Sequence, residues 1–262
     1  MTVDLDLFFS VIAASVTLFL GVIVFLHDRQ SWTNRIFAFH SMIGALWAMV
    51  NYFSLIASQT TALLWIRGVI ALASVYIFVF FLFVKNFPQT YLVPSGYRLL
   101  SILVLMVLMI ISALSPYGFA EVRISSKGIT PIPGEIMPIF AVVLVTFFII
   151  TIFLIAKRYI HSKGTNRRQW FAIGIGLIIA YLLLIVLVFL RVILFGDPTF
   201  VTYSPLFILP VFVGAAYAIL RYRLFNTRLI ATEILTFFIL LISFFQILLA
   251  TTDVAFFLSI GT

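Results

Sequence analysis

Few ionisable side chains lie inside the apolar runs of this sequence, and they are the first candidates for chemistry. Arg67 and Arg191 each lie near one end of such a run, and Trp65 precedes Arg67 by two positions. Charged side chains are costly in an apolar layer and are therefore default candidates for function. If both guanidinium groups approach one cavity, they predict an anionic-ligand site with Trp65 beside it. The alternative is that both arginines extend out of the apolar layer.

Most catalytic chemistry finds no support in the residues. The chain has no cysteine, which excludes disulfides and cysteine metal sites. Paired-histidine zinc motifs, phosphate-binding glycine loops and serine nucleophile elbows are missing from the sequence. His40 is a single histidine without carboxylate neighbours, and we expect it, like the indole of Trp47, to hydrogen-bond inside the fold. The sequence therefore predicts no catalytic residue, no metal and no cofactor.

The composition points to lipid as the solvent. Hydrophobic residues make up 64% of the 262 positions, charged residues 9%, and the mean hydropathy is +1.26. A soluble domain usually carries about 25% charged residues. The apolar runs are continuous and of helical length, which excludes the alternating pattern of an outer-membrane barrel. The chain is therefore predicted to be an integral membrane protein.

Seven apolar runs are long enough to cross a bilayer as helices, which takes about 20 residues. The predicted spans are Leu7–Leu26, Ile36–Ala57, Ala62–Val84, Leu99–Leu114, Met137–Ala156, Trp170–Phe195 and Thr202–Leu220. A further run from Ile234 to Ile260 predicts either one long helix or an eighth span that ends near Ala250 and the start of a ninth, and the second arrangement is favoured. The predicted fold class is all-α, with a seven-transmembrane helix bundle over residues 1–230 and an additional transmembrane segment over 231–262.

Basic residues are distributed unevenly between the loops that alternate along the chain. One set holds twelve: Arg29, Arg35, Lys85, Arg98, Lys157, Arg158, Lys163, Arg167, Arg168, Arg221, Arg223 and Arg228. The other set holds four: Arg67, Arg123, Lys127 and Arg191. Loops rich in Lys and Arg stay in the cytoplasm, so a multi-pass inner-membrane protein with its N-terminus outside is predicted. The net charge of +8 is thereby assigned to topology and membrane lipids, not to nucleic acid.

Span seven contains Pro210 and leads directly into a basic segment. Proline has no N–H and frees the carbonyl of Leu206, which predicts a kink or hinge. Together with Arg221 and Arg223 at the exit, Pro210 is a candidate hinge for signal transfer; plain packing is the alternative.

The longest loop on the outer side covers residues 115–136. Apolar residues flank a turn at Ser125–Gly128, which predicts a short β-hairpin. The hairpin either covers a ligand as a lid or only links spans four and five.

Two stretches resemble a known family. They are Asn34-Arg35-Ile36-Phe37-Ala38-Phe39 followed by Ala45-Leu46-Trp47, and Tyr217-Ala218-Ile219-Leu220-Arg221-Tyr222-Arg223-Leu224-Phe225. Both look like the seven-transmembrane N-terminal region of bacterial sensor histidine kinases, over about Leu7 to Ile230. Asn226 departs from the pattern, which has an aspartate there. The phosphoacceptor hairpin and the ATP-binding domain of the kinase are not found in the sequence.

The resemblance implies a sensory module that receives a small ligand or membrane signal and passes it to a cytoplasmic kinase, in cis or in trans. The chain is then expected to be a truncated or orphaned input module, not itself an enzyme, and able to form a homodimer. The alternative is a small-molecule transporter or channel subunit, although the buried carboxylates of a proton relay are missing from the spans. A membrane anchor or assembly factor without a ligand is the third reading.

Overall fold

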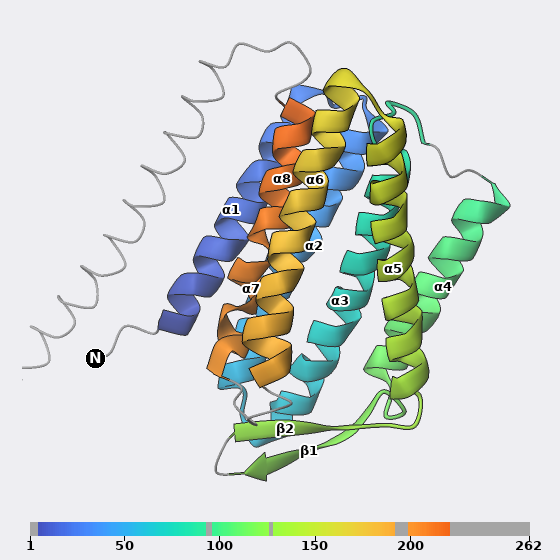
Figure 1. Ribbon diagram of the computed structural model, residues 1–262. Coiled ribbons are helices and arrows are strands. Elements are labelled where there is room, and N and C mark those ends of the chain that lie inside the picture. Colours follow the sequence, from blue (N-terminus) through green and yellow to red (C-terminus); the bar gives the residue numbers. More distant parts are fainter. Residues whose placement is uncertain (1–4, 93–95, 126–127, 192–198, 221–262) are drawn as a thin grey trace, which may run out of the picture. The chain divides into compact units, whose positions relative to one another are not determined.

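A computed structural model describes residues 5–92, 96–125, 128–191 and 199–220. Seven helical segments in this part of the chain are long and apolar enough to cross a membrane, as predicted. They are α1 (Leu5–His27), α2 (Trp32–Ile56), α3 (Gln59–Asn86), α4 (Tyr97–Leu114), α5 (Met137–His161), α6 (Gly164–Leu183) and a seventh span over Phe200–Leu220 (Figure 1). The additional segment predicted over 231–262 lies outside the described residues.

The predicted hairpin is confirmed between α4 and α5. Strands β1 (Phe119–Ser125) and β2 (Gly128–Pro133) pair antiparallel, with Val122 opposite Pro131 and Ile124 opposite Ile129. Arg67 of α3 donates two hydrogen bonds to the carbonyl of Phe119, from Nε at 3.2 Å and from Nη2 at 2.6 Å. The start of the hairpin is therefore joined to α3.

The helices on both sides of the most basic segment are longer than predicted. α5 runs to His161, and α6 begins at Gly164, six residues before the predicted start of span six at Trp170. Lys, Arg and Gln are good helix formers and can continue a helix beyond the apolar layer. Gly164 has a φ of 54°, which glycine adopts without steric cost and which permits the short turn.

Small residues hold α1 and α2 close together. Ala13 and Ala14 of α1 pack against Ala45 and Ala48 of α2. A methyl group added at Gly21 would come within 2.6 Å of the Ser41 side chain. Between helices in lipid, packing depends on such close approach, because burial of apolar surface from water contributes little there.

Arg158 near the end of α5 stabilises the end of α3. Its Nη1 donates to the carbonyls of Val84 at 2.7 Å and Phe87 at 2.5 Å, and its Nη2 donates to the carbonyl of Lys85 at 3.0 Å. The last carbonyls of a helix lack partners within the helix. Arg158, which sequence analysis assigned to topology, thus satisfies three of them.

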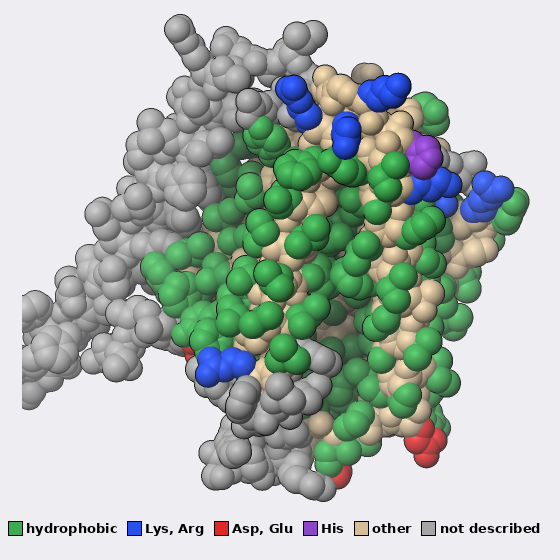
Figure 2. All heavy atoms as spheres, viewed as in Figure 1, with side chains coloured by type: hydrophobic (Ala, Val, Ile, Leu, Met, Phe, Trp, Pro, Cys, Tyr) green, Lys and Arg blue, Asp and Glu red, His purple; other side chains and the backbone are tan. Residues whose placement is uncertain are grey.

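Charge is segregated between the two ends of the bundle (Figure 2). We call the end where α1, α3 and α5 finish the basic end. Among the described residues it carries nine basic side chains: Arg29, Arg35, Lys85, Arg98, Lys157, Arg158, Lys163, Arg167 and Arg168. Asp28 is the acidic residue described there, and its carboxylate accepts from the backbone N–H groups of Gln30 and Ser31. The opposite end holds Asp6, Glu121 and Glu135 together with the basic residues Arg67 and Arg191.

The seventh span is an interior element. Over its most apolar stretch, 56% of the residues are buried inside the protein, the same share as for α3. The corresponding share is 11% for α4 and 17% for α5. In Figure 1 the seventh span lies between α1 and α6, and the contacts agree. The residues around the seventh span therefore form the candidate functional site.

Candidate functional site

The seventh span is interrupted near its middle. It consists of a 3-10 helix η3 (Thr199–Tyr203), a short helix α7 (Ser204–Phe207) and α8 (Leu209–Leu220). Ile208 separates the last two, and Pro210 is the second residue of α8. Proline fits this position because the first N–H groups of a helix have no partner within it. The break falls where the proline predicted one, while its role as a signal-transfer hinge stays a prediction.

α8 packs against α6 so closely that the two backbones touch. Gly176 of α6 faces the carbonyl of Pro210, and Gly214 of α8 faces the carbonyl of Ala172. A methyl group added at either glycine would collide with the carbonyl oxygen that it faces. Small residues four positions apart permit this approach, which gains van der Waals contact along both helices.

A hydrogen bond extends the same contact toward the basic end. Gln169 Nε2 donates to the carbonyl of Ala218 at 2.9 Å, and the glutamine is buried. Residues 169, 172 and 176 of α6 thus face residues 218, 214 and 210 of α8. Positions three and four apart lie on one helix face, so the contact is a continuous stripe. α8 is joined to α6 over nearly its whole length.

The other face of α8 inserts one aromatic ring into the bundle. Phe212 is fully buried, and its ring stacks on His40 of α2, with centroids 4.9 Å apart and planes 28° apart. Tyr76 of α3 and Phe37 of α2 lie 5.9 Å and 6.3 Å from the same ring. A methyl group added at Gly44 would lie 2.6 Å from the Phe212 ring. This aromatic cluster joins α8 to α2 and α3.

Polar atoms in and beside the aromatic cluster have no hydrogen-bond partner among the described residues. They are both ring nitrogens of His40, the hydroxyl of Tyr76 and the indole nitrogen of Trp47. The expected hydrogen bonds of His40 and Trp47 are therefore not found in this part of the chain. His40 is instead enclosed by aromatic faces: Phe80 lies 5.4 Å away and Tyr76 4.3 Å away. Buried polar groups without partners are costly, so these atoms lower the stability of the core.

Further rings continue from the aromatic cluster to the basic end. Centroid distances are 5.7 Å from Phe37 to Phe83, 5.7 Å from Phe83 to Phe87 and 5.0 Å from Phe87 to Trp170. The guanidinium of Arg158 lies 5.0 Å from the Trp170 ring. Aromatic and cation–π contacts therefore form one packed path from the middle of α8 to the end of α3.

The half of the seventh span away from the basic end is irregular, and so is its neighbour. α6 continues there as a π-helix, η1 (Leu184–Phe189), which contacts α7 and η3. The guanidinium of Arg191 lies 4.6 Å from the centroid of the Phe200 ring, and Tyr203 packs edge-on against Phe9 of α1 at 5.2 Å. π-helical turns are rare and occur often at functional sites.

The three residues predicted to bind a ligand are distributed over two elements. Arg67 and Trp65 lie on α3, where Arg67 is engaged with the carbonyl of Phe119 and Trp65 lies 5.0 Å from the ring of Phe53. Arg191 lies after η1, against the ring of Phe200. Each arginine is half-buried, and each holds a different partner in the protein. Arg221 and Arg223 of the predicted hinge lie outside the described residues.

Sequence analysis missed Phe212, Gln169 and Arg158. Phe212 is one of 30 phenylalanines, and nothing in its neighbours distinguishes it. Gln169 directly follows Arg167 and Arg168 in the polar start of α6, so the sequence does not distinguish it from a solvated residue. Arg158 was counted with the other basic residues, because its carbonyl partners are distant in sequence.

The described residues include no group of three His, Asp or Glu side chains placed to hold a metal ion. What the site offers instead is close helix packing, buried aromatic rings and uncharged polar groups.

Comparison with models of protein families matches residues 9–228 to the N-terminal seven-transmembrane region of histidine kinases. The chain belongs to this family. The match confirms the resemblance of the two sequence stretches and covers all seven spans. The family is the membrane sensory region of these proteins and not their catalytic kinase domain. Neither the comparison with curated proteins nor that with solved structures gave a match.

We predict that the backbone contact between α6 and α8 is sensitive to a single methyl group. Gly176→Ala should lower the free energy of unfolding by about 1–3 kcal/mol, because the helices must separate to admit it. Gly174→Ala is the matched control, since its nearest neighbour would be Ile155 at an ordinary 3.4 Å. Thermal unfolding in detergent, followed by circular dichroism, measures both. Equal unfolding temperatures for the two variants would contradict the contact.

Proposed function

We propose that the chain senses a ligand or membrane state and passes it through the seventh span to a cytoplasmic kinase, in cis or in trans. The observation that carries this proposal is the position of α8. It is joined to α6 by backbone contact and to α2 and α3 through Phe212, and it ends at Leu220, directly before Arg221 and Arg223. A change in the position of α6, or of α2 and α3, would therefore displace α8 up to its last residue, Leu220.

The basic end is proposed to face the cytoplasm, with the N-terminus outside in the inner membrane. The support is the nine basic residues and one acidic residue described at that end. An excess of Lys and Arg in short loops sets orientation in this way. The exit of the seventh span then lies on the side where a kinase has access to ATP.

The signal is proposed to enter at the opposite end, with Arg67, Trp65 and Arg191 as the candidate ligand-binding residues. Arg67 lies between α3 and the hairpin, and Arg191 lies between η1 and η3. A guanidinium carries five N–H donors, and Arg67 uses its Nε and Nη2 groups on the carbonyl of Phe119, so it retains donors for an anionic ligand. The hairpin is then a candidate lid, because a ligand that competes for Arg67 would loosen its contact with α3.

The mechanism proposed is a change in the irregular outer half of the seventh span that repositions α8 about Pro210. π-helical, 3-10 and interrupted segments differ little in energy from alternative windings and can rearrange. A ligand biases such an equilibrium only by its differential affinity for the two states. Contact with lipids, a small ligand and a second copy of the chain belong to this proposal.

We predict that the two ends of the bundle are labelled from opposite sides of the membrane. The natural chain has no cysteine, so each introduced cysteine reports on one position. In spheroplasts, a membrane-impermeant maleimide should label Tyr117→Cys directly and Asn166→Cys only after the membrane is disrupted. The unsubstituted chain is the control. Labelling of Asn166→Cys in intact spheroplasts would overturn the orientation.

We predict that the α6–α8 contact controls kinase output. Residues 1–230 are fused to the cytoplasmic half of a histidine kinase of the same family, and autophosphorylation is measured in membranes at equal protein levels. Gly176→Ala should change it by about threefold or more, as a shift of ~0.7 kcal/mol in a two-state equilibrium does, whereas Gly174→Ala should not. Equal output from both would refute signalling through this contact. Solute uptake into proteoliposomes together with unchanged output would favour the transporter alternative.

A further inference from the structure

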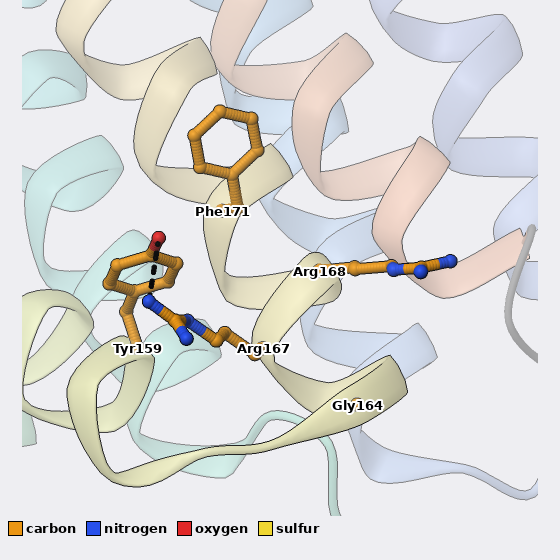
Figure 3. Close-up of a pocket in the computed structure, with 5 residues that line it drawn as sticks. All are labelled: Tyr159, Gly164, Arg167, Arg168 and Phe171. Atoms are coloured by element: carbon orange, nitrogen blue, oxygen red, sulfur yellow. Dashed lines mark hydrogen bonds between the residues drawn. The ribbon is translucent and has the colours of Figure 1, made fainter.

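A groove at the basic end lies outside the contacts described for the seventh span. It has a volume of about 340 Å³ and is lined by Tyr159 at the end of α5 and by Gly164, Arg167, Arg168 and Phe171 at the start of α6. Figure 3 shows the two arginine side chains extending to opposite sides, with the Phe171 ring turned toward the apolar part of the bundle. The groove therefore has a cationic rim and an apolar wall.

The chain segment that forms the groove carries no acidic residue. From residue 136 to residue 196 the sequence contains no Asp or Glu. The guanidinium of Arg167 lies over the ring of Tyr159 at 4.8 Å and donates from Nη2 to its hydroxyl at 3.4 Å. Arg167 is thereby oriented but keeps donors free, and Arg168 is exposed. Guanidinium groups are the side chains that best match phosphate oxygens.

An apolar stripe leads from the groove along the surface of α6. Phe171, Ile175, Ile178 and Leu182 recur at helical spacing and are 53%, 43%, 67% and 60% exposed. The eleven steps from residue 171 to residue 182 span about 16 Å at 1.5 Å per residue. Half of the hydrocarbon thickness of a bilayer is about 15 Å. The length of the stripe therefore matches the depth to which one lipid acyl chain extends into the bilayer.

We propose that this groove binds the phosphate headgroup of one anionic phospholipid, whose acyl chain lies along Phe171–Leu182. Arg167, oriented by Tyr159, supplies the guanidinium on the side of the groove, and Arg168 adds positive charge from the other side of α6 (Figure 3). The stripe distinguishes a lipid from a soluble phosphate. This lipid site does not depend on a kinase, and its test measures lipid binding itself. If the chain does not bind the lipid, the proposed sensory function is unaffected.

The test uses the purified chain in neutral detergent, titrated with phosphatidylglycerol or phosphatidylcholine and observed by native mass spectrometry. The wild type should bind phosphatidylglycerol in preference to phosphatidylcholine. Arg167→Gln/Arg168→Gln should weaken phosphatidylglycerol binding at least tenfold, at about fivefold for each basic side chain near an anionic headgroup. Lys157→Gln/Lys163→Gln removes the same charge from exposed positions outside the groove. It should weaken binding clearly less than the arginine double variant, because it removes only attraction from a distance to the anionic headgroup.

Three outcomes would overturn the proposal. Equal weakening in the two double variants would show diffuse attraction to the basic end. Equal binding of both lipids by the wild type would show that charge is not recognised. Displacement of phosphatidylglycerol by millimolar glycerol 3-phosphate would assign the groove to a soluble anion. If the arginine double variant does not fold, Arg167→Gln alone, at an exposed position on the side of Tyr159, should still weaken binding about fivefold.

Discussion

The arrangement of this bundle depends on one constraint, the direct contact between the backbones of α6 and α8. Gly176 against Pro210 and Gly214 against Ala172 bring the two helices together without an intervening side chain. The hydrophobic effect does not drive helices together within lipid, so van der Waals contact between closely packed backbones stabilises the helix pair. Because side chains elsewhere on α8 are placed by this contact, the insertion of Phe212 among α2 and α3 follows from it.

Two halves of the seventh span then have different properties. From Pro210 to the basic end it is a regular helix with fixed neighbours, whereas toward the other end it is short, interrupted and opposite the π-helix of η1. A sensory region needs an input part that can rearrange and an output part that stays intact. This division fits the proposed signalling path, because a stiff α8 would transmit a displacement better than a flexible one.

The sequence predicted the spans and the hairpin, because length, hydropathy and alternation are local properties. It could not predict which glycine touches a neighbour: Gly176 does and Gly174 does not, and only the rotation of α6 decides this. The partner of Arg67 is a backbone carbonyl, which no sequence pattern reveals. The rings around His40 come from α3 and α8. The local sequence of α2 therefore could not show that aromatic faces surround the imidazole in place of hydrogen-bond partners.

Spin-label distance measurement on the cysteine-free chain tests the division of the seventh span most directly. Labels at Ile175 and Tyr217 report on the joined half, and labels at Ile185 and Phe207 report on the irregular half. We expect one narrow distance distribution for the first pair and a broad or two-peaked distribution for the second, because only the second pair lies where the helices can rearrange. Equally narrow distributions for both pairs would contradict the division on which the signalling mechanism depends.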